Sequence, residues 1–357
     1  MSLSIGIVGL PNVGKSTLFN ALTDAGALAA NYPFATIEPN TGIVPVPDER
    51  LAVLAKMYKT EKIIPATVTF VDIAGLVSGA SQGEGLGNKF LANIRECDAI
   101  IQVVRAFENS DILRHDNTTK VSPQKDIEII QTELILADIQ TIENHLPKLG
   151  KERKADPKVD EKIEYLKNVQ NELLSGKIPQ DFDKDLLNEL QLLTAKPVIY
   201  VFNVNESTLT NNEAQKELSD LVLPAKSVFI CAKLEEDLKS LSAIETTELL
   251  SDFGIIESGL AQLSKTAYDV LGLQSFLTAG EKEVRAWTIK KGFTAPQAAG
   301  VIHTDFERGF IAAQVIDYND LISAGSESAA RSLGKIRTEG KTYVMQPNDV
   351  VEFKFNV

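Results

Sequence analysis

A phosphate-binding loop signature lies near the start of the chain, in the run Gly9-Leu10-Pro11-Asn12-Val13-Gly14-Lys15-Ser16. The run matches G-x-x-x-x-G-K-[S/T], in which glycines let backbone N–H groups turn toward phosphate oxygens at the start of a helix. Apolar residues at 3–8 predict a buried strand before it, and residues 17–22 predict a helix after it. The sequence therefore predicts a strand–loop–helix unit that binds a nucleoside triphosphate, with Lys15 on the β- and γ-phosphates and the Ser16 hydroxyl on Mg²⁺.

Length and composition favour a globular protein of more than one domain. The chain has 357 residues, of which 44% are hydrophobic and 24% are charged. Its apolar runs are too short to cross a bilayer, and Cys97 and Cys231 form no disulfide or zinc pattern, so we expect a cytoplasmic protein. The net charge of −13 argues against binding of DNA or a membrane by the surface as a whole.

Short apolar runs alternate with helical stretches in two parts of the chain, residues 1–121 and 196–275. Continuous apolar runs at 68–71, 99–104 and 197–202 predict strands that are buried on both faces. Strands of this kind separated by helices predict an α/β domain with a parallel or mixed sheet. Ligands of such sheets bind beyond the carboxyl ends of the strands, where the motifs of this chain fall.

The pattern changes between residues 122 and 195, where apolar residues recur at spacings of three and four. The first series is Ile127, Ile130, Leu134, Ala137, Thr141, His145 and Leu149. A second series follows a polar break, so two helices are predicted to fold back on each other as a coiled-coil hairpin. This arm has two interpretations, a structural element or a lever that binds a partner.

Residues 276–357 predict a separate α+β module. Strands are expected at 284–289, 310–315 and 350–355, with a short helix at 295–303. Basic residues occur throughout this part of the chain, and they could form a local positive patch.

The segment Asp72-Ile73-Ala74-Gly75 matches D-x-x-G at the end of a predicted strand. Asp72 is expected to hold Mg²⁺ through water, and the backbone N–H of Gly75 to contact the γ-phosphate. The next stretch, residues 79–87, is rich in glycine. We therefore expect a switch segment that becomes ordered when a nucleoside triphosphate binds. Thr36 is our candidate for the switch threonine that binds Mg²⁺, and Thr41, which we expect in the same loop, is the alternative.

The base-binding segment is Asn203-Val204-Asn205-Glu206, at the end of another predicted strand. Guanine-specific proteins carry N-K-x-D here, so Val204 and Glu206 argue against guanine, while the Asn203 amide can bond a purine edge. Cys231, Ala232 and Lys233 follow the next strand and are expected to line the same pocket. The predicted nucleotide contacts are therefore Asn12, Val13, Gly14, Lys15, Ser16, Thr17, Gly75, Asn203, Val204, Glu206, Cys231, Ala232 and Lys233.

Together these motifs resemble the YchF subfamily of Obg-like ATPases, within the translation-factor class of P-loop GTPases. The resemblance covers the whole chain and rests on G-x-P-N-V-G-K-S, N-Y-P-F-x-T-I-x-P-N, D-I-A-G-L and N-V-N-E. It implies that residues 122–195 are an inserted helical hairpin and that residues 276–357 form a TGS domain, a ubiquitin-like β-grasp. It also implies a preference for ATP or acceptance of both ATP and GTP, and a role linked to the ribosome or ribosomal RNA.

The resemblance adds two roles at the γ-phosphate. Leu76 occupies the position where related enzymes carry the glutamine that orients the attacking water, and the resemblance assigns that task to His115. In related proteins with an apolar residue after D-x-x-G, an asparagine at the position of Asn12 helps to bind K⁺, which we expect here as a second cation.

The sequence thus predicts a Mg²⁺-dependent nucleoside triphosphatase that prefers ATP and works as a molecular switch, with Lys15 and His115 as its catalytic residues. Two alternatives stay open: a GTP-specific GTPase, and a nucleotide-gated scaffold whose hydrolysis is incidental. A small-molecule kinase fits less well, because the sequence shows switch motifs and no acceptor lid.

Overall fold

The computed structural model describes residues 3–29, 40–73, 86–108, 120–152, 158–179, 181–183 and 189–356. The chain forms two compact units. The first unit comprises Met1–Gly42 and Thr69–Gln262, and the second comprises Ile43–Val68 and Leu263–Val357. Within the described ranges, every helix is too short or too polar to span a membrane.

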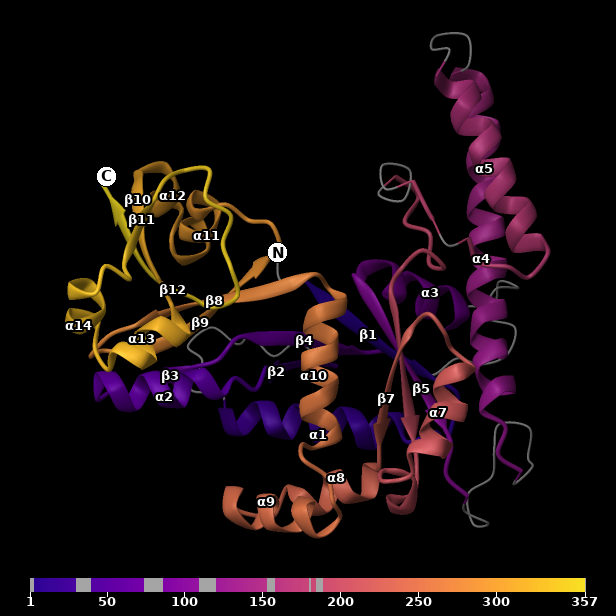
Figure 1. Cartoon of the computed structure of the whole chain (residues 1–357). Coiled ribbons are helices and arrows are strands. Elements are labelled where there is room, and N and C mark those ends of the chain that lie inside the picture. Colours follow the sequence, from indigo (N-terminus) through magenta and orange to yellow (C-terminus); the bar gives the residue numbers. More distant parts are fainter. Residues whose placement is uncertain are drawn as a thin grey trace. The chain divides into compact units, whose positions relative to one another are not determined.

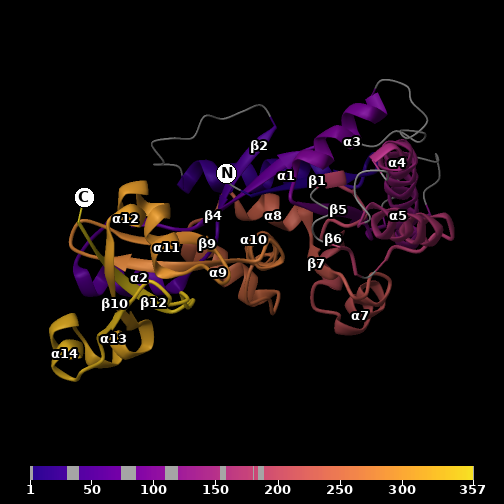
Figure 2. The same cartoon turned by 90° about the horizontal axis from the view of Figure 1, so that it is seen from above.

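A six-stranded sheet in the order β2-β4-β1-β5-β6-β7 holds the phosphate-binding loop (Figures 1 and 2). The pairs β1–β4, β1–β5, β5–β6 and β6–β7 are all parallel, which confirms the predicted α/β fold. Every residue of β5 is buried, because helices cover both faces of the sheet. The strands are β1 (Ser4–Gly9), β2 (Thr41–Pro45), β4 (Thr67–Asp72), β5 (Ala99–Arg105), β6 (Val198–Asn203) and β7 (Lys226–Ile230).

The helices around this sheet follow the strands in the chain, and α1 contacts both β1 and α8. They are α1 (Lys15–Ala29), α3 (Leu86–Glu96), α7 (Asn212–Asp220), α8 (Ala232–Leu238) and α9 (Ala243–Asp252), together with the short 3-10 helix η2 (Glu206–Thr208). The next helix, α10 (Gly259–Val270), begins in the first unit and continues into the second from Leu263.

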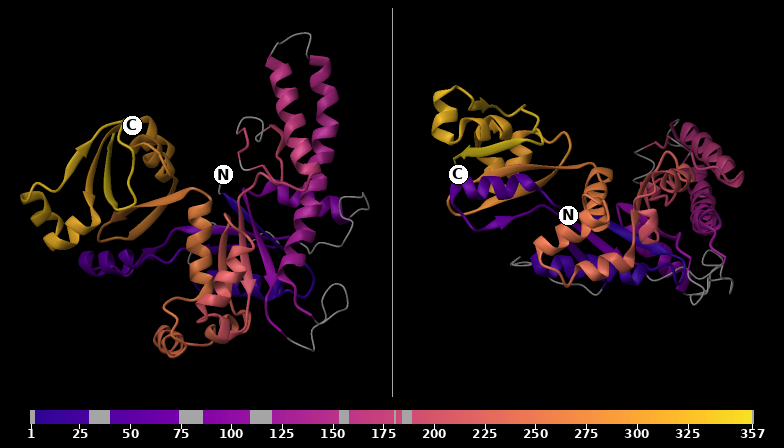
Figure 3. Two further views of the ribbon diagram at one scale, coloured as in Figure 1. Left: turned by 45° about the vertical axis from the view of Figure 1, so that its right-hand side comes forward. Right: turned by 60° about the horizontal axis from the view of Figure 1, so that its bottom comes forward.

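The helical arm consists of α4 (Pro123–Glu152) and α5 (Lys158–Leu174), which lie side by side (Figure 3). Most of the apolar series predicted for the first helix is buried, while Thr141 and His145 are half-buried. A cluster of buried residues joins the two helices to the segment that returns to β6. It contains Ile139, Ile142, Leu149, Val159, Leu166, Val169, Leu173, Leu190 and Leu192.

The second unit is built on a mixed sheet in the order β11-β10-β12-β8-β9-β3. The strands are β3 (Ile63–Ile64), β8 (Leu273–Ala279), β9 (Val284–Lys290), β10 (Phe310–Asp317), β11 (Arg337–Glu339) and β12 (Asp349–Phe355). The helices are α2 (Glu49–Tyr58), α11 (Ala295–Ile302), α12 (Thr304–Arg308), α13 (Tyr318–Ala324) and α14 (Glu327–Ser332).

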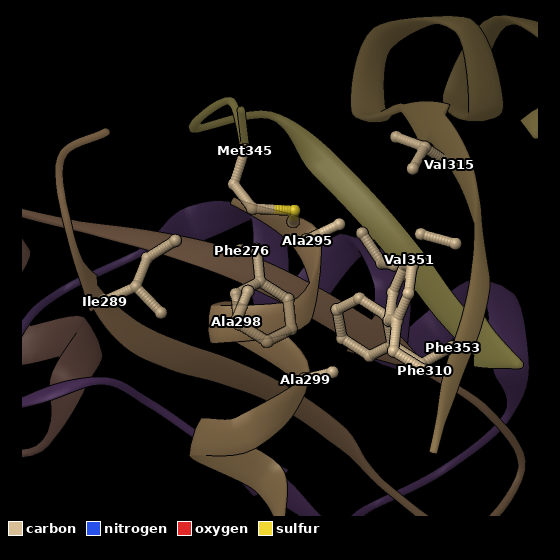
Figure 4. Close-up of a cluster of buried hydrophobic side chains, with 11 residues drawn as sticks. Phe276, Ile289, Ala295, Ala298, Ala299, Phe310, Val315, Met345, Val351 and Phe353 are labelled. Atoms are coloured by element: carbon tan, nitrogen blue, oxygen red, sulfur yellow. The ribbon is translucent and has the colours of Figure 1, made fainter. Parts of the chain in front are cut away.

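The core of this unit lies between the sheet and α11 (Figure 4). Three alanines of α11, at 295, 298 and 299, are fully buried, and their small side chains allow the helix to approach the strands. Phe353 of β12 meets Phe276 of β8 edge-on, with ring centroids 5.6 Å apart. An α+β module is present as predicted, and its assignment as a TGS domain stays a prediction.

Two features of the second unit differ from what the pattern indicated. β8 spans Leu273–Ala279 and so crosses residue 276, where we expected the module to begin. Residues 43–68, which include α2 and β3, group with this unit, although they lie inside the stretch assigned to the nucleotide domain. Periodicity reports burial and does not say which sheet a strand joins, so neither feature was visible in the sequence.

Candidate functional site

The phosphate-binding loop turns through two left-handed residues, Asn12 (φ 63°) and Gly14 (φ 93°), before α1 begins at Lys15. A Cβ at Gly14 would lie 2.3 Å from Nδ2 of Asn203, so only glycine fits. The Gly14 carbonyl accepts from the N–H of Leu18 at 3.0 Å, as the first helical hydrogen bond. The loop and helix therefore have the arrangement that the motif predicts.

We expect Gly14→Ala to lower nucleotide affinity by about tenfold or more, because the added methyl group displaces Asn203 and strains the left-handed backbone at residue 14. The measurement is titration of a fluorescent nucleotide with Mg²⁺ present. Gly176→Ala is the matched control: its φ is also left-handed, at 77°, but nothing lies within 4 Å of the added Cβ. The control should lose about 1–2 kcal/mol of folding stability and bind nucleotide normally. Equal affinity of Gly14→Ala and wild type would contradict the argument.

Lys15 is paired with a carboxylate in this structure. Its Nζ donates to Oδ1 of Asp72, the last residue of β4, and both side chains are partly buried. The sequence assigned Lys15 to the phosphates and Asp72 to the metal, and the fold brings these two groups into contact. The Asp72 carboxylate and the Ser16 hydroxyl are hard oxygen donors of the kind that Mg²⁺ prefers.

Asn203, at the end of β6, joins the phosphate-binding loop to the pocket beside it. Its Nδ2 donates to the Val13 carbonyl at 3.0 Å, and its Oδ1 accepts from the Ala232 N–H at 3.2 Å. The side chain is almost fully buried. Each amide atom retains one further hydrogen-bonding position, so a contact with a purine stays a prediction.

A cavity of about 760 Å³ opens beside this bridge. It brings together predicted residues from three distant segments: the loop, the Asn203–Glu206 run and the Cys231–Lys233 run. Its lining consists of Asn12, Gly14, Thr17, Phe107, Glu108, Asn203, Val204, Asn205, Glu206, Ser207, Cys231, Ala232, Lys233 and Glu236. The volume suits a nucleoside, because ligand pockets typically measure about 300–1,000 Å³.

One ion pair and one buried thiol lie among the residues that line the cavity. Nζ of Lys233 lies 3.6 Å from Oε1 of Glu206, and both residues line the cavity. Val204 is buried, and its N–H donates to the Ile230 carbonyl. Burial raises the pKa of the Cys231 thiol, which makes it less reactive than an exposed cysteine.

Sequence reasoning missed Phe107, Glu108, Ser207 and Glu236 as lining residues. Phe107 and Glu108 follow β5 at its carboxyl end, so the rule that ligands bind beyond strand ends could have found them. Phe107 is held by Arg105, a fully buried cation whose guanidinium carbon lies 4.7 Å from the ring centroid. Nε of Arg105 also donates to the Phe107 carbonyl at 3.2 Å.

Three predicted site residues, Thr36, Gly75 and His115, lie outside the described residues, as does Leu76. Thr41, the alternative switch threonine, begins β2, next to β4 in the sheet. It was expected in a loop, and its place in a strand corrects that expectation. His145 lies in α4 of the arm, and His303 is the N-cap residue of α12.

A parallel sheet with a phosphate-binding loop after β1, an aspartate at the end of β4 and an asparagine that bridges loop and pocket defines a P-loop nucleoside triphosphatase of the G-domain class. Residues 4–137 match the family model described as "50S ribosome-binding GTPase". Residues 273–356 match a model for the C-terminal region of YchF GTPases, described as "Protein of unknown function".

Similar proteins extend this match to the whole chain. The chain is 50% identical to "Ribosome-binding ATPase YchF" of Pasteurella multocida and 47% identical to the protein of that name from Bacillus subtilis, with both chains covered completely. The solved YchF GTPase of Schizosaccharomyces pombe is 40% identical, with a TM-score of 0.87 over 99% of this chain and 98% of that one. This chain belongs to the YchF family.

Proposed function

We propose that this protein is a Mg²⁺-dependent nucleoside triphosphatase that prefers ATP to GTP and acts as a molecular switch on the ribosome, in the cytoplasm. The observation that carries the proposal is the Asn203 bridge, which joins a loop built for phosphates to a cavity of nucleoside size. The names of the relatives, which describe ribosome-binding ATPases, support the choice of nucleotide and partner.

The reaction is in-line attack of water on the γ-phosphate. Lys15 and the backbone N–H groups of the loop stabilise the negative charge that develops on the phosphate oxygens. Lys15, which donates to the Asp72 carboxylate in this structure, would turn to the phosphates, and Asp72 would hold Mg²⁺ together with Ser16 and Thr36. Bound Mg²⁺ supplies further positive charge at the β- and γ-phosphates.

Two parts of the proposal rest on resemblance. His115 would position the attacking water, because Leu76 has no group that can form a hydrogen bond. Asn12 would bind K⁺ beside the phosphates, and its left-handed backbone already turns the loop at this position.

The preference for adenine follows from the base-binding segment. Val204 lacks the lysine stem that covers guanine, and the Glu206 carboxylate is engaged by Lys233 rather than held in place for two guanine donors. The Lys233 ammonium group also offsets the charge of the Glu206 carboxylate, so that this carboxylate repels the N1 acceptor of adenine less.

The experiment measures hydrolysis of ATP and GTP with Mg²⁺, each with and without ribosomes. We expect kcat/KM for ATP to exceed that for GTP by about tenfold, and ribosomes to raise ATP turnover by about tenfold or more. A higher kcat/KM for GTP would replace the proposal by a GTP-specific GTPase. Turnover that ribosomes leave unchanged would favour the scaffold with incidental hydrolysis.

A further inference from the structure

Polar side chains from three chain segments meet where the helical arm joins the sheet. Arg95 comes from the end of α3, Asp138 and Thr141 from the middle of α4, and Thr194 and Lys196 from the segment that leads into β6. We call these five residues the arm-base cluster. It lies within the first unit and outside the cavity described above.

The end of α3 is tied to both of the other segments. Nη2 of Arg95 donates to Oγ1 of Thr141 at 3.2 Å, which links α3 directly to the arm. Nζ of Lys196 donates to the carbonyls of Arg95, at 3.0 Å, and of Cys97. A displacement of α3 therefore acts on the arm and on the start of β6 together.

Asp138 connects the arm to the segment before β6 by hydrogen bonds. Its side chain is fully buried and accepts from the N–H groups of Leu193 and Thr194, at 2.8 and 2.7 Å, and from the Thr194 hydroxyl at 2.7 Å. Burial raises the pKa of Asp138, and the positive charge of Arg95 works in the opposite direction. Buried polar contacts of this kind hold one geometry, because a group that loses its partner is left unsatisfied.

Two routes connect this cluster to the nucleotide site. On one side, α3 begins at Leu86, in the chain that leaves β4 after Asp72. On the other side, Lys196 lies just before β6, and β6 ends at Asn203, which is bonded to the phosphate-binding loop. The cluster is thus attached to the segment that leads into β6, whose end carries Asn203, and to α3, which follows β4 in the chain.

We propose that the arm-base cluster couples the helical arm to the nucleotide site, so that a change of α3 on triphosphate binding is passed to α4 through Arg95 and Thr141. This inference rests on the proposed function, because it requires a bound nucleotide. It assigns the arm the role of a lever rather than that of a passive structural element. Arg95 and Thr141 are positioning residues in this account and take no part in the chemistry.

The test is amide hydrogen exchange of the arm, compared between ADP and a non-hydrolysable ATP analogue. In the wild type, exchange within α4 at residues 134–145 should differ between the two nucleotides by about fivefold or more. Thr141→Val and Arg95→Met should each remove most of this difference. Nucleotide affinity, measured first, should stay within about twofold of wild type in both variants, because neither residue touches the cavity.

Matched controls exist on the same two helices. Thr132 of α4 donates to the Glu128 carbonyl one turn back, as Thr141 does to Ala137, but it is exposed, so Thr132→Val tests the loss of a helical threonine alone. Lys89 of α3 is also exposed, so Lys89→Met tests the loss of a cation there. Both controls should keep the wild-type difference.

Three outcomes would overturn the inference. The first is a wild-type arm whose exchange is the same with both nucleotides although both bind. The second is an unchanged nucleotide-dependent difference in Thr141→Val and Arg95→Met, and the third is loss of that difference in the controls as well. Failure of the wild type to bind either nucleotide would instead refute the proposed function, and the inference would fall with it.

Discussion

Lys15→Ala is expected to lower kcat/KM for ATP by about 100-fold or more, because removal of one donor to a developing phosphate charge has an effect of this size. The Lys15 ammonium lies at the start of α1 and contacts Asp72, the residue that we propose for the metal. Among the described residues that line the cavity, Lys233 is the single lysine, and it follows β7 rather than the phosphate-binding loop. Phosphate release under steady-state conditions provides the measurement.

Lys62→Ala is the control for this variant. Lys62 also pairs with a carboxylate, that of Glu283 at 2.6 Å, but in the second unit and at an exposed site. The control should hydrolyse ATP at the wild-type rate. If Lys15→Ala hydrolysed ATP at the wild-type rate, the loop would not bind the triphosphate through Lys15, and the proposed function would fail.

Local signals in the sequence predicted most of the first unit. The phosphate-binding loop has a fixed chemistry, so its glycine and lysine positions could be assigned from spacing alone. The parallel sheet followed from continuous apolar runs such as that of β5, whose residues are all buried. The arm followed from a helical period that persists across α4.

Contacts between distant segments could not be predicted in the same way. The pattern placed Asn203 at the base, but its bonds to the loop and to Ala232 depend on how β6 and β7 pack against β1. The arm-base cluster was missed because Arg95, Asp138 and Lys196 are far apart in the chain and belong to no motif. The placement of residues 43–68 in the second unit depends on tertiary pairing of β3 with β9, which leaves no local mark.

Glu235 of α8 is a buried carboxyl group that the reaction does not use. Only 5% of the residue is exposed, and its Oε1 accepts from the N–H of Gly259, at the start of α10, at 2.6 Å. Burial raises the pKa of Glu235 from its ordinary 4.5 to about 7, although hydrogen bonds from the Gly259 and Leu260 backbone favour the charged form. A Cβ at Gly259 would lie 2.8 Å from Cγ1 of Ile230 and 3.1 Å from this oxygen, so the close packing here favours glycine.

The raised pKa makes the folding stability depend on pH. At pH values below the pKa that Glu235 has in the unfolded chain, its carboxyl group is protonated in both the folded and the unfolded state, so it does not lower the free energy of unfolding. As pH rises toward 7 the unfolded chain releases this proton while the folded chain retains it, so the free energy of unfolding falls. The total loss is about 3 kcal/mol, at 1.36 kcal/mol for each pKa unit.

Glu235→Gln should therefore flatten this dependence, because the amide does not titrate and its carbonyl can still accept from Gly259. Between about pH 5 and pH 8, we expect the free energy of unfolding of the wild type to fall by about 3 kcal/mol relative to that of the variant. Urea unfolding followed by far-UV circular dichroism measures both. Fluorescence of Trp287 follows the second unit separately, since it is the single tryptophan of the chain. Glu236→Gln, which alters the exposed neighbour, should leave the pH dependence of wild type intact. Parallel pH profiles for wild type and Glu235→Gln would show that this carboxyl group is not held protonated by its burial against α10.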